Sequence, residues 1–285
     1  MARNVLWLDS TIDQTQTVIE QAVAELGPTD FNVIMLPFLH VHQDQSLWYN
    51  NKPVSQLWSG VPAALQRLKG DFQTKKTLIA SIGGWGNKLD FEYAAAKPSL
   101  FWDNLSKFCA DFHIDGIDLD FEGPYDDKHL ACLVIMAKTI KSQKASMLLT
   151  AAPYEDMDWW LGDGGLLSKT ARPDGGNLFD WLNVQFYSGE SNIGPSEWSA
   201  TFKDWLDKLT GSWNGIGTAN GPAFLVPGCN ANSGYKTSAL SQGIANGLKN
   251  YPAMGGAFVW TYTQIRGNAA PWASTIKNAF GGKAP

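Results

Sequence analysis

The sequence has little cysteine, little histidine and no excess of positive charge. Its 285 residues include three cysteines and four histidines, and 22 Lys and Arg stand against 27 Asp and Glu. Cys109, Cys132 and Cys229 are far apart and fit no metal-ligand spacing, so we interpret them as buried thiols. Because the net charge is −5 and no basic patch stands out, we expect no nucleic-acid partner.

Long apolar runs and low-complexity linkers are also missing. No segment approaches the length of a membrane span, so we expect no membrane partner. No Pro-, Gly- or Ser-rich stretch divides the chain, which favours one domain over residues 1–285, and we expect a monomer. The start, MARNVLWLDS, has no apolar signal-peptide core. We favour an extracellular mature form whose leader has been removed, with a cytoplasmic protein as the alternative.

Tryptophan, in contrast, is abundant, with 13 residues. Aromatic faces stack on sugar rings and on other planar apolar faces, so an excess of tryptophan indicates flat binding platforms. We expect most of these side chains to pack in the core and a handful to contact a ligand.

Eight apolar, strand-like runs recur along the chain, and amphipathic stretches separate most of them. This alternation predicts an α/β fold, a single (β/α)8 TIM barrel. A doubly wound open sheet is disfavoured because the one Gly-rich candidate for a phosphate loop, 215–221, precedes a strand. The predicted strands are Val5–Asp9, Phe31–Leu39, Thr77–Gly83, Gly116–Glu122, Met147–Pro153, Trp181–Tyr187, Ala223–Pro227 and Ala257–Tyr262. The predicted helices are Asp13–Leu26, Gln56–Leu68, Leu100–Phe112, Asp127–Ser142, Pro195–Leu209, Ser238–Lys249 and Trp272–Phe280.

Three acids alternate with apolar residues in the fourth run, which reads IDGIDLDFEG over residues 114–123. Alternate strand residues share a face, so Asp118, Asp120 and Glu122 are predicted to point into the barrel. Glu122 comes last, at the C-terminal mouth where barrel active sites lie. Burial and neighbouring acids raise a carboxyl pKa, as a general acid requires. Asp115 has the wrong parity, and we assign it a structural role.

Two other uses of these acids are possible from the sequence. They could be neutralised by buried Lys or Arg, although no strand core offers an inward-pointing basic residue. They could bind a divalent metal, although three ligands along one strand wrap an ion poorly. His40 and His42 have the spacing of a zinc pair, but His113 and His129 lie in or beside helices and supply no third ligand. We therefore expect neither a metal nor a cofactor.

The acidic run also carries a family resemblance. Residues 115–122 resemble the D-G-x-D-x-D-x-E signature of family 18 glycoside hydrolases, which include chitinases and endo-β-N-acetylglucosaminidases. Residues 81–84, Ser-Ile-Gly-Gly, resemble the family's S-x-G-G segment at the end of the third strand. Residues 185–187, Gln-Phe-Tyr, are similar to its Q-F-Y or M-x-Y segment, and Trp260 resembles the tryptophan lining its central sugar subsite. These matches fall in order on strands three, four, six and eight.

The resemblance implies substrate-assisted catalysis, an exception to the usual two-carboxylate scheme. Glu122 would protonate the glycosidic oxygen, and the N-acetyl carbonyl oxygen of the substrate would attack its own anomeric carbon. Asp120 would hold the acetamido N–H and stabilise the oxazolinium ion. Asp118, helped by Ser81, would share a proton with Asp120.

The remaining predicted site residues contact the sugar. The resemblance implies that Tyr187 hydrogen-bonds the acetamido oxygen, that Trp260 stacks beneath the ring, and that Gln185 lines the site. Trp85 is our candidate for a second sugar platform at the barrel mouth, and Tyr154 is expected to line the cleft. Further candidates at the mouth are Glu155, Trp159, Trp160, Asn230 and Asn232.

The chain departs from the family pattern in three places. Ser188 and Gly189 follow Tyr187 where many members have Asp or Asn, and the first strand lacks a bracing tyrosine. Only 29 residues separate Pro227 from Ala257, too few for the α+β insertion domain of processive relatives. The predicted fold is therefore a TIM barrel without that insertion, with an open cleft.

The implied function is an endo-acting chitinase whose partners are chitin or N-acetylglucosamine oligosaccharides, hydrolysed with retention. An endo-β-N-acetylglucosaminidase acting on N-glycan cores uses the same chemistry and stays open as an alternative. A non-catalytic, chitin-binding lectin-like barrel is the second alternative, although such relatives usually lose the acid that is present here as Glu122.

Overall fold

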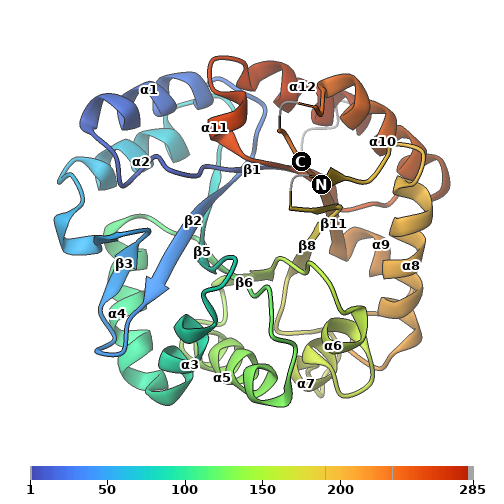
Figure 1. The fold of residues 1–285 in the computed structure, drawn as a ribbon, viewed down its shortest axis with the longest axis horizontal. Coiled ribbons are helices and arrows are strands. Elements are labelled where there is room, and N and C mark those ends of the chain that lie inside the picture. The colour runs from blue at the N-terminus through green and yellow to red at the C-terminus, as the bar shows by residue number, and fades with distance from the viewer. Residues whose placement is uncertain (1, 190, 233, 282–285) are drawn as a thin grey trace.

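Eight parallel strands close into a barrel in the computed structural model, which describes residues 2–189, 191–232 and 234–281 (Figure 1). The strands are β1 (Arg3–Trp7), β2 (Val33–Val41), β5 (Thr77–Gly83), β6 (Gly116–Asp120), β7 (Leu148–Ala151), β8 (Trp181–Gln185), β11 (Leu225–Asn230) and β12 (Gly256–Trp260). Each pairs in parallel with the next in this order, and β12 pairs with β1 to close the ring. The predicted TIM barrel is confirmed.

Helices surround the strands as an outer ring (Figure 1). The principal ones are α1 (Gln16–Leu26), α2 (Val61–Gly70), α4 (Pro98–Asp111), α5 (Asp127–Gln143), α8 (Trp198–Gly211), α10 (Thr237–Asn250) and α12 (Ala269–Ala279). Each buries an apolar stripe at helical spacing; α1, for example, buries Ile19, Ala22, Val23 and Leu26. These seven helices correspond to the predicted ones, with ends that differ by a few residues.

Several shorter elements were not predicted. An antiparallel extension of β2 contains β3 (Leu47–Tyr49) and β4 (Lys52–Pro53), and α3 (Lys88–Ala96) precedes α4. The others are η1 (Val54–Gln56), α6 (Met157–Leu161), α7 (Leu166–Thr170), β9 (Tyr187–Ser188), β10 (Ser191–Asn192), α9 (Gly221–Phe224) and α11 (Tyr262–Ile265). The predicted seventh strand began too early, because residues 221–224 form α9.

The core has two layers, which follow from side-chain alternation along the strands. On β1, Leu6 packs in the large layer between strands and helices, whereas Val5 and Trp7 belong to a smaller cluster inside the barrel. On β2, Ile34 faces outward and Met35 inward in the same way. The pattern of period two thus separates the helix-facing residues from the barrel interior.

Close approach of two strands explains the glycine that opens β6. A Cβ added to Gly116 would lie 2.7 Å from Cβ of Leu148 and 2.9 Å from its carbonyl oxygen on β7. Any larger residue would push these strands apart, so Gly116 fixes the register in which Asp118 lies opposite Thr150.

The connection between β11 and β12 is short, as predicted. In its described parts, 231–232 and 234–255, the only helix is α10 and there is no strand. Across the described residues, no helix combines the length and the apolar character needed to cross a bilayer.

Candidate active site

The acids of the fourth barrel strand face the interior. Ile117 and Leu119 pack in the helix-facing layer, whereas Asp118 and Asp120 on β6 are 0% and 2% exposed inside the barrel. Glu122 follows two residues after the end of β6 and is half-buried at the C-terminal mouth. The strand is therefore shorter than predicted, and Glu122 belongs to the loop that leaves it.

Asp118 is held by neutral donors from three other strands of the barrel. Its Oδ2 accepts a hydrogen bond of 2.9 Å from Ser81 Oγ on β5, and its Oδ1 accepts one from the hydroxyl of Thr150 on β7. Asn183 Nδ2 on β8 donates to the same Oδ1 at 3.2 Å. Burial raises the pKa of Asp118 to about 6, and these three hydrogen bonds oppose the rise.

Asp120 and Glu122 are bridged by one amide. Gln185 Nε2, at the end of β8, donates to Asp120 Oδ1 at 3.2 Å and to Glu122 Oε1 at 3.5 Å. Burial, followed by the negative charges of Glu122 and Asp118, raises the pKa of Asp120 well above its ordinary value. Burial also raises the pKa of Glu122, which the Gln185 hydrogen bond opposes and the charge of Glu155 reinforces. The cluster therefore retains protons toward neutral pH.

Neutralisation by a basic residue is not what the structure shows. Across the described residues, no Lys or Arg forms an ion pair with Asp118, Asp120 or Glu122. Carboxylates buried without a cation are unfavourable for stability, so their clustering points to chemistry.

Aromatic rings form one wall of the interior beside the acids. Trp260, at the end of β12, packs edge-on against Trp7 with ring centroids 5.4 Å apart, and against Phe38 at 5.8 Å. Tyr187 packs against Phe258. Burial, then the charges of Asp120 and Glu122, raises the pKa of the Tyr187 phenol well above its ordinary value, so the hydroxyl stays a donor.

At the mouth, two predicted contact residues meet. Trp85 is 73% exposed, and its ring lies edge-to-face with Tyr154 at a centroid distance of 6.2 Å. The Tyr154 hydroxyl is 2.7 Å from Ser188 Oγ, so the residue that departs from the family pattern orients this tyrosine. Tyr154, Gln185 and Tyr187 also line a cavity of about 450 Å³ between the ends of β7 and β8.

Trp159 and Trp160 were wrong as candidate platforms. They are 8% and 0% exposed, and Trp159 stacks on Phe121 with ring centroids 5.3 Å apart. Both also pack against Tyr125, so they support the segment that carries Glu122 from the helix side. Asn230 likewise uses its amide on the carbonyl of Gly189, at 2.9 Å.

The histidine pair does not form a metal site. His40 Nδ1 lies 2.8 Å from Asp90 Oδ2, and His42 stacks on the ring of Trp48. Across the part of the chain that is described, no three His, Cys, Asp or Glu side chains are grouped to hold an ion. Asp115 accepts a hydrogen bond of 2.9 Å from the Leu78 amide, far from the mouth, which fits its structural role.

Thr150, Asn183, Trp7 and Phe38 were missed from the sequence. Thr150 and Asn183 stand in the predicted fifth and sixth strands, where a polar residue among apolar ones is a signal of an inward-facing partner. Trp7 and Phe38 resemble ordinary core residues, and nothing in their runs sets them apart.

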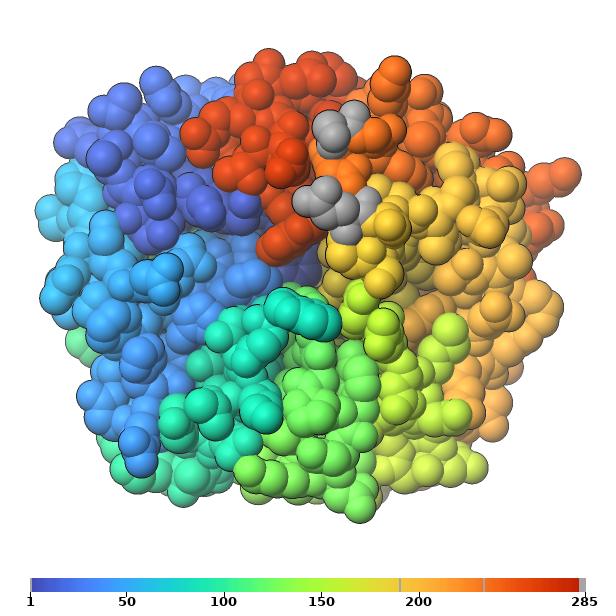
Figure 2. All heavy atoms as spheres, in the orientation of Figure 1, coloured from blue at the N-terminus to red at the C-terminus, as the bar shows by residue number. Residues whose placement is uncertain are grey.

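The fold and the acids define a TIM barrel of the glycosidase type, with its carboxylates at the C-terminal mouth of the strands. The space-filling view shows the centre of the ring hollowed where segments from both halves of the chain meet (Figure 2). A sequence profile described as "Glycosyl hydrolases family 18" matches residues 7–226. The chain therefore belongs to glycosyl hydrolase family 18.

Two of the curated relatives are fungal chitinases. "Chitinase 2" of Rhizopus oligosporus is 26% identical over 266 residues, which are 86% of this chain and 46% of that protein. "Endochitinase 1" of Metarhizium robertsii is 24% identical over 204 residues, which are 66% of this chain and 41% of that protein. The chain thus spans less than half the length of these relatives.

Solved structures share the barrel over nearly the whole chain. A chitinase from Pseudoalteromonas aurantia has a TM-score of 0.71 at 15% identity, covering 96% of this chain and 98% of that one. A fungal endo-β-N-acetylglucosaminidase has a TM-score of 0.66 at 17% identity, covering 99% of each chain. A chitinase-like agglutinin from Robinia pseudoacacia has a TM-score of 0.67 at 14% identity, covering 98% of this chain and 100% of that one. At these identities the likeness establishes the fold alone.

Proposed function

We propose that the protein is an endo-acting chitinase that hydrolyses β-1,4-linked N-acetylglucosamine polymers with retention by substrate-assisted catalysis. The observation that carries this proposal is a half-buried Glu122 with a raised pKa at the mouth of the barrel, directly after the strand that holds the buried Asp118 and Asp120. A raised pKa favours the protonated form of the carboxyl group, which is the form that a general acid needs.

In the first step, Glu122 gives its proton to the glycosidic oxygen. The acetamido carbonyl oxygen of the sugar in the central subsite attacks the anomeric carbon as the glycosidic bond breaks. The electron pair of the broken bond goes to the leaving oxygen. The product is a cyclic oxazolinium ion. Asp120 accepts a hydrogen bond from the acetamido N–H and compensates the positive charge, a role that its position below Glu122 supports.

In the second step, Glu122 acts as a base. Its carboxylate takes a proton from water, whose oxygen attacks the anomeric carbon and opens the oxazolinium ring. Two displacements at one carbon restore the original configuration, so the expected stereochemical outcome is retention.

Two aromatic residues orient the sugar for this sequence. Tyr187 keeps its hydroxyl proton because burial and nearby acids raise its pKa, so it donates to the acetamido oxygen. Trp260 is braced by Trp7 and Phe38, and its free face supports the ring of the central sugar. Placing the carbonyl oxygen against the anomeric carbon is an entropic contribution to the rate.

The proposed endo mode of cleavage and the proposed chitin substrate are both supported by features at the mouth of the barrel. The connection between β11 and β12 contains α10 but, in its described parts, no strand that could form an extra groove wall. The exposed ring of Trp85 beside Tyr154 suits a second sugar along an open cleft. The names of the curated relatives, chitinase and endochitinase, agree with this substrate.

We further propose that residues 1–285 form one catalytic domain that acts as a monomer, without a metal or cofactor, and outside the cell, where chitin lies. The inward faces of the helices and the outward faces of the strands share one continuous apolar layer, which supports a single domain.

The experiment compares the wild type with Glu122→Gln on a defined chito-oligosaccharide and on a high-mannose glycopeptide. We expect internal cleavage of the oligosaccharide to β-anomeric products, lost in the variant by at least about 100-fold. Asp103→Asn, at an exposed acid on α4 in the outer ring of helices, is the control and should keep its activity within a few-fold. Cleavage of the glycopeptide alone would make the protein an endo-β-N-acetylglucosaminidase, and sugar binding without hydrolysis in either form would make it a lectin.

A further inference from the structure

A chain of buried polar groups leads from Asp118 toward the N-terminal end of the barrel. Asn183 donates its amide Nδ2 to Asp118 Oδ1 at 3.2 Å, and Asn183 Oδ1 accepts a hydrogen bond of 2.9 Å from the indole Nε1 of Trp181. Trp181 and Asn183 are two residues apart on β8, so both point into the barrel. The exposed fractions of Trp181, Asn183 and Asp118 are 4%, 0% and 0%.

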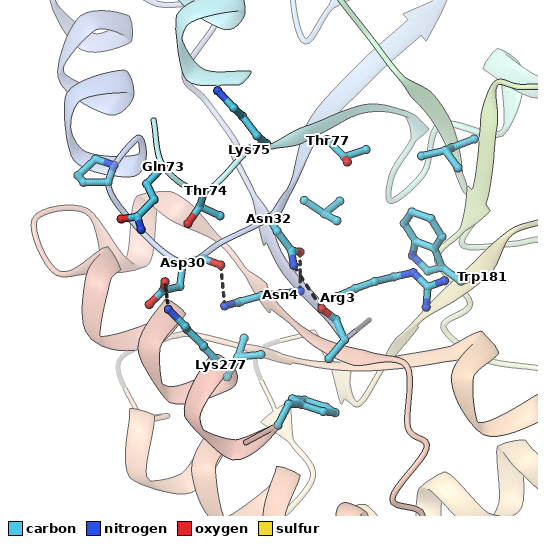
Figure 3. A pocket seen from close by; sticks show the side chains of 16 residues that line it. Arg3, Asn4, Asp30, Asn32, Gln73, Thr74, Lys75, Thr77, Trp181 and Lys277 are labelled. Atoms are coloured by element: carbon cyan, nitrogen blue, oxygen red, sulfur yellow. Dashed lines mark hydrogen bonds and ion pairs between the residues drawn. The ribbon is translucent and has the colours of Figure 1, made fainter. Parts of the chain in front are cut away.

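Trp181 is contacted by Arg3 from the side of the strand starts. The guanidinium of Arg3 lies 4.3 Å from the centre of the indole ring, and Arg3 Nη1 donates to the carbonyl oxygen of Ala223 at 2.9 Å. Arg3 and Trp181 both line a cavity of about 800 Å³ at the strand starts. Figure 3 shows the Arg3 side chain extending to Trp181. Burial lowers the pKa of Arg3 to about 10, so it remains a cation at neutral pH and keeps its contact with the ring.

The direction of the amide matters because a carboxamide has a donor end and an acceptor end. An indole N–H can only donate, so it selects the orientation in which Asn183 Oδ1 faces Trp181. The NH2 group then faces Asp118 and stabilises its charged form. Without the indole donor, the amide could rotate and present its oxygen to Asp118, which would stabilise the protonated acid instead.

The other groups around Asp118 bring no positive charge that would fix the ionisation state of the cluster, so neutral donors such as Asn183 have a large effect on it. Its neighbours on β5 and β7 are the hydroxyls of Ser81 and Thr150, which carry no charge. The titratable groups that face it are Asp120 on its own strand, with Glu122 and Tyr187 beyond. Asp120 and Glu122 disfavour a further negative charge in the cluster, and the Tyr187 phenol stays neutral, so the neutral donors decide whether the Asp118–Asp120 pair is charged.

We propose that Trp181 is a positioning residue that acts through Asn183: its indole N–H fixes the amide as a donor to Asp118, so that Asp118 and Asp120 together hold one negative charge, which Asp120 can present to the oxazolinium ion. This inference deepens the proposed function and rests on it for the role of Asp120. In this arrangement Arg3 keeps the Trp181 indole in place through its contact with the ring.

The test is the pH dependence of hydrolysis in Trp181→Phe, which keeps an aromatic ring over Arg3 but removes the N–H. We expect the acidic limb of kcat/KM to move upward by about one pH unit, a tenfold loss on that limb. The matched control is Trp272→Phe on α12, an equally buried tryptophan in the helix layer, which should leave the profile unchanged. Replacement of Trp181 by benzothienylalanine, with sulfur in place of the N–H, repeats the test with almost no change of shape.

A double-variant cycle separates action through Asn183 from a general loss of packing. In an Asn183→Leu background, Trp181→Phe should add no further shift. An unchanged profile in both Trp181 variants, an equal shift in Trp272→Phe, or additive shifts in the double variant would each overturn the proposal.

A readout without turnover separates this proposal from the proposed function. Carbon-13 NMR of labelled aspartate side chains follows the titration of Asp118 directly, and it should show the same upward shift in the Trp181 variants. If the wild type hydrolyses nothing but the NMR shift is seen, the proposed function fails and the positioning role stands. If the enzyme is active but the titration of Asp118 is not shifted in the Trp181 variants, the positioning role fails and the proposed function stands.

Discussion

Ser81 and Asp118 lie opposite each other on neighbouring strands, and the Ser81 hydroxyl donates a hydrogen bond of 2.9 Å to Asp118 Oδ2. A neutral hydroxyl stabilises a buried carboxylate only in part, because it brings no compensating charge. The acid therefore remains unfavourable to ionise, and this property can be measured as stability.

Asp118→Asn should stabilise the protein at alkaline pH and not at acidic pH. The pKa of Asp118 is raised from 3.8 to about 6 in the folded protein, so the folded state binds its proton more tightly than the unfolded state. The resulting stability is complete below about pH 4 and is lost as the pH rises through about 6, a difference of roughly 3 kcal/mol. Asparagine cannot ionise, and the Ser81 hydroxyl can rotate to accept from its amide.

Urea unfolding near pH 4 and near pH 8 checks this expectation. The free energies of unfolding of wild type and variant should agree at the lower pH and differ by up to about 3 kcal/mol at the higher one. Asp103→Asn, at an exposed position on α4, is the control and should match the wild type at both. A variant that is no more stable than the wild type near pH 8 would contradict the raised pKa.

Asp120→Ala should lose turnover with little loss of binding. The oxazolinium ion carries a positive charge that Asp120 is proposed to compensate, and removing one such contact costs about 100- to 1,000-fold in kcat. Steady-state kinetics on a chito-oligosaccharide measures kcat and KM separately. Asp103→Ala provides the comparison at an exposed acid, and a fall in kcat/KM caused by KM alone would exclude the role given to Asp120.

A thiazoline derived from N-acetylglucosamine should inhibit competitively. Its fused ring has the shape of the oxazolinium intermediate, and a site complementary to that intermediate binds it more tightly than substrate. We expect inhibition by the thiazoline at concentrations at least about 100-fold below the KM, and weaker inhibition in Asp120→Ala. Equal inhibition of wild type and variant would separate Asp120 from the intermediate.

The sequence alone predicts the barrel and the acidic strand because both depend on local periodicity. In β6, acids and apolar residues alternate, and this parity is sufficient to direct Asp118 and Asp120 inward. Thr150 and Asn183 could not be assigned, because their contact with Asp118 depends on the register between strands that are separated by whole helices. Register is set by packing across the barrel, which no single run of residues contains.

Trp85 and Trp160 illustrate a second limit. Both follow barrel strands at the mouth, yet Trp85 is 73% exposed and Trp160 is 0% exposed. What separates them is the presence of other rings, because Trp159 and Tyr125 pack against Trp160 whereas Trp85 has Tyr154 at its edge. Exposure of a tryptophan therefore follows from its tertiary neighbours, and the sequence around it carries little of that information.

Trp85→Ala should weaken binding of long substrates more than short ones. An exposed ring at the mouth contacts a sugar only when the chain extends beyond the central subsite, and loss of one stacking platform of this kind costs about 1–2 kcal/mol, or roughly 5- to 30-fold in KM. We expect that loss with a hexasaccharide or with insoluble chitin, and little change with a short chromogenic glycoside. Trp213→Ala is a matched control, since Trp213 is 69% exposed on the loop that follows α8 and leads to the strand starts. Equal effects of the two substitutions, or an equal effect of Trp85→Ala on short and long substrates, would remove Trp85 from the cleft.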